Sequence, residues 1–208
     1  MDCDARCDSC MIPKFTLQPL VENAIFHGIE PKGSAGEVTL RVERDTANGD
    51  VLIHLTDDGV GMAPEDAGVC FLRHATSKLS DERGLEAIGT MGFRGEALAS
   101  IASVARVEVL TRTADAECAS VYHIEGGEEQ PMEPGARGVG TTIRVRDLFY
   151  NTPARMKFLK KDSSEGTFVA DTVAHVALSH PEVSFKFIRE GKLQYVTPAT
   201  VSCAVQHM

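Results

Sequence analysis

The feature that most constrains the fold is a glycine loop that leads directly into a helix-forming run, MGFRGEALASIASV at residues 91–104. Gly92 and Gly95 bracket two residues, and the run that follows from Glu96 consists mostly of residues that favour helices. Such a loop presents free backbone N–H groups at the positive end of a helix dipole. The segment therefore predicts a phosphate site, although an isolated G-x-x-G is more often a turn before an ordinary core helix.

The composition indicates a single domain with a substantial core, because 43% of the 208 residues are hydrophobic. No run approaches the ~20 apolar residues of a membrane span and no signal peptide opens the chain, so we expect a cytoplasmic protein. The net charge of −9 argues against a general nucleic-acid binder. However, residues 137–161 hold seven basic side chains against Asp147 alone, which indicates either a strip that contacts a phosphate backbone or a solvated face.

Three of the six cysteines, Cys3, Cys7 and Cys10, have a C-x3-C-x2-C spacing that resembles the cluster-binding motif of radical SAM enzymes. An iron–sulfur cluster needs three thiolates inside an enclosing fold, and no barrel-like series of strands and helices follows this motif. We therefore expect reduced, unlinked thiols, as is usual in a cytosolic protein.

A helix with one buried face is predicted after Pro13, because apolar residues recur there at i, i+3, i+4, i+7 and i+8. These residues are Leu17, Leu20, Val21, Ala24 and Ile25. Asn23 lies off this stripe, one turn before His27, and Gly28 can end the helix. Taken alone, Asn23 is explained as a mid-helix polar residue that faces solvent, and only the sequence that follows weakens that interpretation.

Two alternating segments, residues 37–43 and 51–56, predict strands joined by a hairpin at residues 46–50. The second strand runs into DDGVGM at residues 57–62, a D-x-G-x-G pattern that is usually only a turn when it stands alone. Similar patterns predict strands at residues 104–113, 120–124, 141–146, 183–189 and 193–196, helices at 154–160 and 164–180, and a loop at 126–140.

Three blocks of sequence stand out downstream: FLRHATSKL at residues 71–79, IGTMGFRGEALASIASV at 88–104 and GTTIRVRDLFYNTPARMKFLKK at 140–161. Together and in this order, they resemble the MutL-type mismatch-repair ATPases. That family belongs to the GHKL superfamily, which also includes gyrase, the Hsp90 chaperones and the histidine kinases. The likeness extends from about residue 70 to about residue 197.

The first helix carries a different signature, LQPLVENAIFHG at residues 17–28, which resembles the catalytic domain of sensor histidine kinases. That likeness covers about residues 11–62. The chain therefore looks chimeric, with a kinase-like part at 13–69 and a MutL-like part at 70–198. We expect a single GHKL ATPase-type domain at 13–198, after a disordered leader at 1–12 and before an unassigned tail at 199–208.

Both likenesses imply the Bergerat-type ATP-binding fold of the GHKL superfamily. This fold is an α/β (α+β) two-layer sandwich with a mixed, largely antiparallel sheet.

The resemblance also implies a site for Mg²⁺ and ATP, the two expected cofactors. Asn23 falls on the superfamily's metal-binding asparagine, whose amide oxygen suits Mg²⁺. Asp57 would accept a hydrogen bond from the exocyclic amine of adenine, and Gly59 and Gly61 would let the backbone approach the ring. The other residues that the resemblance assigns to the nucleotide are Met62, Thr76, Ser77, Gly92, Phe93, Arg94, Gly95, Glu96, Ala97, Leu98 and Thr142.

One departure from the family bears on hydrolysis. MutL and gyrase keep a glutamate four residues before the metal-binding asparagine, where it activates the attacking water. Here that position is Pro19, which cannot accept a proton, and Glu22 points about 100° away from Asn23 around the helix. General-base assistance is worth about 10²–10⁴-fold, so we expect weak or absent turnover and assign no catalytic residue.

The expected function is that of the Mg·ATP-binding N-terminal domain of a MutL-type DNA mismatch-repair protein. The family's partners are the mismatch-recognition protein MutS and a second MutL copy, and we expect any DNA contact to involve Arg144, Arg146, Arg155 and Lys157. One alternative is a sensor histidine kinase domain that donates phosphate to a histidine helix. Another is a nucleotide-gated binding module without turnover, or a nonfunctional fusion.

Overall fold

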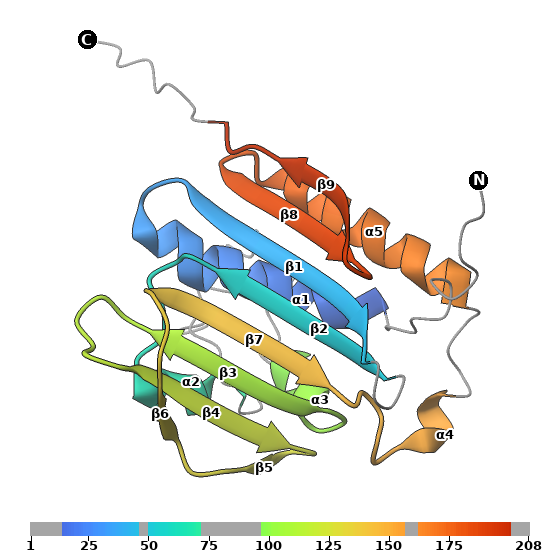
Figure 1. Ribbon diagram of the computed structural model, residues 1–208, viewed down its shortest axis with the longest axis horizontal. Coiled ribbons are helices and arrows are strands. Elements are labelled where there is room, and N and C mark those ends of the chain that lie inside the picture. The colour runs from blue at the N-terminus through green and yellow to red at the C-terminus, as the bar shows by residue number, and fades with distance from the viewer. Residues whose placement is uncertain (1–13, 46–49, 72–96, 157–161, 201–208) are drawn as a thin grey trace, which may run out of the picture.

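The protein folds as two layers, a single mixed β-sheet and a layer of helices on one face of it (Figure 1). The computed structural model describes residues 14–45, 50–71, 97–156 and 162–200. The strands in these ranges are β1 Gly36–Arg44, β2 Val51–Asp57, β3 Arg106–Arg112, β4 Ala119–Glu125, β5 Glu128–Glu129, β6 Glu133–Gly135, β7 Gly140–Arg146, β8 Val183–Arg189 and β9 Lys192–Thr197. The helical segments are α1 Lys14–Asn23, η2 Ala24–Ile29, η3 Glu30–Lys32, α2 Pro64–Val69, α3 Ala97–Ala102, α4 Pro153–Met156 and α5 Asp162–Ser179.

The strand order is β5-β4-β3-β7-β2-β1-β8-β9, and β6 also pairs with β4. Strands β1 and β8 run parallel, whereas the other neighbouring pairs of described strands are antiparallel. The expected fold class, a two-layer sandwich with a mixed, largely antiparallel sheet, is therefore confirmed. For the site, the important consequence is that β7 lies between β2 and β3.

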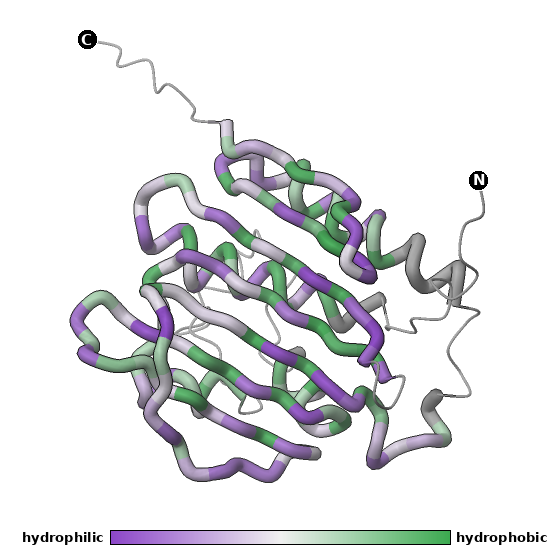
Figure 2. Tube along the Cα trace, in the orientation of Figure 1, coloured by the Kyte–Doolittle hydropathy of each residue, from purple (hydrophilic) through white to green (hydrophobic). Residues whose placement is uncertain are grey.

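Alternating side chains separate the two faces of the sheet, as the alternating colours along the strands show (Figure 2). The face that is covered by helices carries fully buried residues such as Leu40, Leu55 and Phe187, whereas Arg41 and His54 occupy the other face. The stripe predicted for the first helix is confirmed, because each of its five apolar residues is buried. Burying one such side chain contributes about 1.5–3 kcal/mol and an exposed ion pair about 0–1 kcal/mol, so apolar burial holds the layers together.

The first helix ends later than predicted. After α1, the chain continues through the π-helical segment η2, in which the N–H of Glu30 donates to the carbonyl of Ile25, and then through the 3-10 turn η3. Gly33 ends the run in a left-handed conformation with a φ of 65°. Gly28 does not cap the helix, because it lies buried within η2 and packs against the end of β2.

The predicted loop at residues 126–140 contains two short strands. Gly126 and Gly127 adopt φ values of 59° and 93°, which turn the chain back so that β5 and then β6 pair with β4. Sequence periodicity cannot reveal strands of two and three residues, because so short a run contains no repeat.

The helices near the C-terminal end of the described chain agree with the predicted pattern. The helix predicted at 164–180 is α5, and α4 coincides with the start of the helix predicted at 154–160; residues 157–160 lie outside the described residues. Within the described ranges, no helix combines the length and the apolar content that crossing a membrane requires.

Candidate functional site

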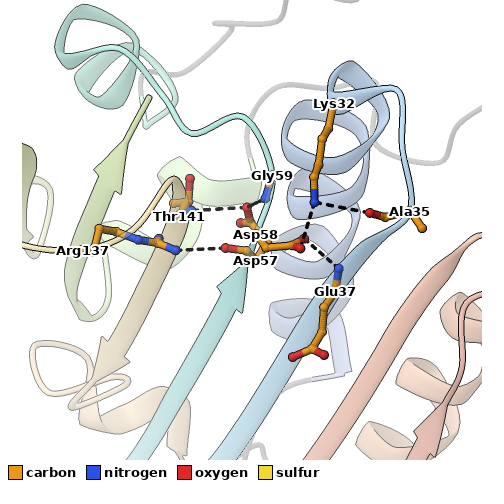
Figure 3. A network of polar contacts seen from close by, with 8 residues as sticks. All are labelled: Lys32, Ala35, Glu37, Asp57, Asp58, Gly59, Arg137 and Thr141. Atoms are coloured by element: carbon orange, nitrogen blue, oxygen red, sulfur yellow. Dashed lines mark hydrogen bonds and ion pairs between the residues drawn. The ribbon is translucent and has the colours of Figure 1, made fainter. Parts of the chain in front are cut away.

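The site centres on Asp57, a carboxylate at the end of β2 that is only 5% exposed. Its Oδ1 accepts hydrogen bonds from the backbone N–H of Gly59 at 2.9 Å and of Thr141 at 3.3 Å (Figure 3). Both side-chain hydrogen bonds that Asp57 makes within the described residues fall on this one oxygen. Oδ2 thus remains available for a further donor.

Burial raises the pKa of Asp57 to about 6, because the ionised form loses its water. The N–H of Gly59, the guanidinium of Arg137 and the N–H of Thr141 oppose that effect and lower the pKa, whereas the neighbouring Asp58 raises it. Asp57 is therefore largely ionised at neutral pH and acts there as an acceptor.

Glycines allow η2 to pack directly on the loop after β2. A Cβ on Gly59 would collide with the backbone of Gly28, and a Cβ on Gly28 would lie 3.0 Å from Oδ1 of Asp57. The N–H of Val60 donates to the carbonyl of Gly28 at 3.0 Å, which joins the two segments. Gly61 has a φ of 77° and passes against the backbone of Arg112. The glycines of the D-x-G-x-G pattern thus serve close packing between backbones.

A buried threonine that the sequence analysis missed supports this loop from β3. Oγ1 of Thr111 accepts a hydrogen bond from the N–H of Met62 at 2.8 Å and donates to the carbonyl of Gly140 at 3.2 Å. It also lies 3.1 Å from Oγ1 of Thr141. Nothing in the local sequence marks Thr111, since its role depends on β3 pairing with β7 so that Thr111 lies opposite Thr141.

The structure does not bring Thr142 to this site. Successive residues of a strand point to opposite faces of a sheet, and Thr142 lies on the face away from the helices, where its Oγ1 is 3.2 Å from that of Thr56. Thr141, one residue earlier, is buried and meets Asp57. Of these two neighbouring threonines, Thr141 therefore contacts Asp57 and Thr142 does not.

Asn23 is half-buried at the junction between α1 and η2, five residues before Gly28. Its side chain makes no hydrogen bond with the described residues, and its amide oxygen is therefore not used in the scaffold that the structure describes. Pro19 lies inside α1. The carboxylate of Glu22 accepts a hydrogen bond from Nε2 of Gln18 at 2.8 Å.

The second aspartate, Asp58, has a different environment (Figure 3). Its Oδ2 pairs with Nζ of Lys32 at 2.9 Å, and its Oδ1 accepts a hydrogen bond from the N–H of Glu37 at 2.7 Å. Partial burial opposes its charge, but these donors outweigh that effect and lower the pKa of Asp58. Asp58 joins η3 to β1, whereas Asp57 faces the site.

The sequence analysis counted Arg137 among the basic residues of the segment 137–161, but in the structure Arg137 is not part of an exposed basic strip. Its Nη1 donates to the carbonyl of Leu110 at 3.1 Å and its Nη2 to the carbonyl of Asp57 at 3.0 Å. The side chain is half-buried, and burial lowers its pKa.

The residues proposed for a DNA contact are divided between the sheet and α4. Arg144 and Arg146 lie on the open face of β7, where both pair with Glu108, and the second of these pairs measures 3.8 Å. Arg155 lies in α4, and Lys157 lies outside the described residues.

Most of the predicted phosphate loop also falls outside the described residues. This applies to Thr76, Ser77, Gly92, Phe93, Arg94, Gly95 and Glu96. Ala97 and Leu98 open α3, and Leu98 is buried. The predicted helix after the glycine loop is thus present.

The sequence matches the family model described as histidine kinase-, DNA gyrase B-, and HSP90-like ATPase over residues 13–148. DNA mismatch repair protein MutL of Thiobacillus denitrificans is 41% identical over 197 residues, covering 94% of this chain and 31% of the relative. MutL of Koribacter versatilis is 45% identical over 174 residues, covering 84% of this chain and 26% of the relative. The chain therefore spans about a third or less of the length of these curated relatives.

Solved structures give the same result. The Aquifex aeolicus MutL ATPase domain complexed with ADP matches with a TM-score of 0.67 and 27% identity, covering 92% of this chain and 65% of that one. The family model and the 41% match both extend across residue 70, so they give no support to a change of family there. The chain belongs to the family of histidine kinase-, DNA gyrase B- and HSP90-like ATPases, and within it resembles the ATPase domains of MutL mismatch-repair proteins.

Proposed function

We propose that this chain is the Mg·ATP-binding domain of a MutL-type mismatch-repair protein and that Asp57 recognises the adenine base. The observation that carries the proposal is a buried carboxylate whose Oδ1 is held by two N–H groups, while Oδ2 takes no donor from the described residues. Because Asp57 is only 5% exposed, a ligand amine that donates to Oδ2 would add a hydrogen bond to a carboxylate that has lost most of its water.

The exocyclic amine of adenine is the donor that fits this acceptor. A guanine base places a carbonyl oxygen at the corresponding position, so it would leave the carboxylate of Asp57 facing a second acceptor. Sites built around a buried polar partner discriminate strongly against a ligand that lacks the matching group. The MutL structure solved with ADP supports an adenine nucleotide as the ligand.

For the metal, we propose that the amide oxygen of Asn23 is the protein ligand of Mg²⁺. Mg²⁺ prefers hard oxygen ligands and usually keeps waters and nucleotide phosphates as its other ligands, so one amide oxygen is a sufficient contribution from this helix. When bound, the ion neutralises phosphate charge. We assign Thr76, Ser77 and residues 92–98 to the phosphates on the family resemblance, and Thr141 in place of Thr142 to the support of Asp57.

The partners proposed for the whole protein follow from its relatives. We propose a second copy of the protein and MutS as partners, because the curated relatives are MutL proteins that extend well beyond the length of this chain. We also propose that turnover is impaired, since Pro19 offers no proton-accepting group one helical turn before Asn23.

Changing Asp57 to Asn should abolish recognition of adenine while preserving the fold. The amide oxygen of the variant still accepts from Gly59 and Thr141, but its NH₂ group then faces the adenine amine. Wild-type protein should gain about 2.7 kcal/mol of stability at 100 times the dissociation constant of Mg·ATP, a shift of several degrees in Tm, and Asp57→Asn should show none. Asp58→Asn is the matched control and should keep the shift, because Asp58 is engaged with Lys32 and Glu37. An unchanged shift in Asp57→Asn would refute the base site.

The same residue predicts a pH dependence of stability without nucleotide. The pKa of Asp57 is raised from 3.8 to about 6 in the folded protein, so between these values the folded state binds a proton that the unfolded state has released. The contribution of Asp57 to the free energy of unfolding is therefore complete below about pH 4, and it is lost as the pH rises through 6. Urea unfolding from pH 4 to 7.5 should show wild type losing about 2–3 kcal/mol relative to Asp57→Asn, with no further change above pH 7. A constant difference would contradict the raised pKa.

Restoring a carboxylate at residue 19 tests the loss of the general base. Wild type should hydrolyse ATP slowly or not at all, and Pro19→Glu should raise kcat by about 10²-fold or more with little change in affinity. Pro19→Gln is the control, because it removes the proline ring and adds a side chain of the same size without a base. Equal gains in both variants would show that the backbone, rather than the missing carboxylate, limits turnover.

A DNA contact through Arg144 and Arg146 predicts a characteristic salt response. Each phosphate neutralised contributes about 0.9 to the slope of log affinity against log salt, so Arg146→Met should reduce that slope by about one. Glu108→Gln should instead strengthen binding at low salt, because Glu108 pairs with both arginines in the free protein. Fluorescence anisotropy with duplex DNA at several salt concentrations measures both effects. A flat salt response in wild type would remove the contact.

A further inference from the structure

We propose that Arg137 is a positioning residue for base recognition, one that braces the backbone of Asp57 and supplies the positive charge beside its carboxylate. This inference rests on the proposed adenine site and deepens it. Arg137 precedes β7 and carries no motif signal, so only its contacts distinguish it from the other arginines of the chain.

The guanidinium joins two strands that do not pair with each other. The carbonyl of Leu110 belongs to β3 and that of Asp57 to β2, and β7 lies between these strands in the sheet. Arg137 donates to the carbonyl of Leu110 at 3.1 Å and to that of Asp57 at 3.0 Å, so its planar fork spans the beginning of β7. Figure 3 shows the hydrogen bond to Asp57. Asp57 is therefore held at two points. Arg137 donates to its backbone carbonyl, and the N–H of Thr141 donates to its side-chain carboxylate.

The backbone at the start of β7 leaves space for the side chain of Arg137. Gly140 has a φ of 119°, and a Cβ there would collide with the carbonyl of Asp57 and lie 3.0 Å from Nη2 of Arg137. A larger residue at 140 would push the guanidinium away from both carbonyls. Gly140 thus permits the close approach of both the carbonyl of Asp57 and the guanidinium of Arg137.

The positive charge of Arg137 makes a second contribution to base recognition, separate from its hydrogen bonds. Arg137 is the basic residue whose field favours the ionised form of Asp57, whereas Asp58 disfavours it. Lys32 is instead paired with Asp58 at 2.9 Å. Removing the guanidinium should leave a carboxyl that is more often protonated, and a protonated Asp57 directs an O–H donor at the adenine amine.

Two variants separate the brace from the charge. Arg137→Met removes both, whereas Arg137→Lys keeps the charge but loses the fork that reaches two carbonyls. Arg41→Met is the matched control, because Arg41 is a half-exposed arginine of β1 that pairs with Glu43 on the open face of the sheet. All three variants are first checked for a cooperative thermal melt. If Arg137→Met does not fold, the milder Arg137→Lys still tests the proposal.

The first readout needs no nucleotide. The chemical shift of the Asp57 carboxyl carbon is followed by NMR as the pH is varied. Its signal is identified as the one that is absent from Asp57→Asn. Arg137→Met should raise the pKa of Asp57 by about half a unit to one unit, Arg137→Lys should leave it near the wild-type value, and Arg41→Met should not change it. An unchanged pKa in a folded Arg137→Met would overturn the electrostatic part of the proposal.

The second readout is the affinity for Mg·ATP by calorimetry at pH 7.5 and 6.5. Arg137→Met should weaken binding about tenfold, and the loss should deepen at the lower pH, while Arg137→Lys should lose about threefold at both values because only the brace is impaired. Unchanged affinity in both variants would overturn the positioning role. A wild-type protein that fails to bind Mg·ATP, together with a shifted Asp57 pKa in Arg137→Met, would instead refute the adenine site and leave the electrostatic link intact.

Discussion

The burial of one ionisable group, the carboxylate of Asp57, is the constraint around which the surrounding structure is arranged. An ionised carboxylate that is only 5% exposed costs free energy unless donors surround it. Here two backbone N–H groups converge on Oδ1 and a guanidinium lies beside the carbonyl of the same residue. The compensation is incomplete, since the pKa still rises to about 6. An incompletely compensated acceptor that is held rigidly is suited to a ligand donor.

Each donor to this group comes from a different part of the fold. Gly59 lies in the loop after β2, Thr141 is the second residue of β7, and Arg137 lies in the segment before β7. Thr111 of β3 then ties Met62 and Gly140 together beneath them. A change in the register between β7 and either neighbour would move these groups by one residue and reverse the side chains that face the helices. The geometry of the site therefore depends on the same strand register that keeps the apolar side chains of the sheet against the helices.

Local patterns predicted most of the elements. The helical spacing before residue 26 and the alternation in the strands reflect burial on one face, which local sequence records. The D-x-G-x-G pattern together with the family resemblance led to the proposal for Asp57, and the resemblance led to the proposal for Asn23. In contrast, the sequence did not show that Thr141 rather than Thr142 contacts Asp57, and Thr111 and the inward position of Arg137 were missed. Each of these depends on which strands are neighbours, and no short window of sequence contains that information.

The sequence by itself determined the amphipathic elements, the acidic group at the end of a strand and the family to which the chain belongs, because these features are written in consecutive or regularly spaced residues. Only the tertiary structure decided which threonine of the pair at 141–142 faces Asp57, and that an arginine from a basic segment turns inward to join β3 and β2. The physical reason is the long-range pairing of β7 between β2 and β3, which brings together residues 80 and 84 positions apart. Glycine at 28, 59 and 140 permits that approach, since a side chain there would occupy the space of the neighbouring backbone or carboxylate.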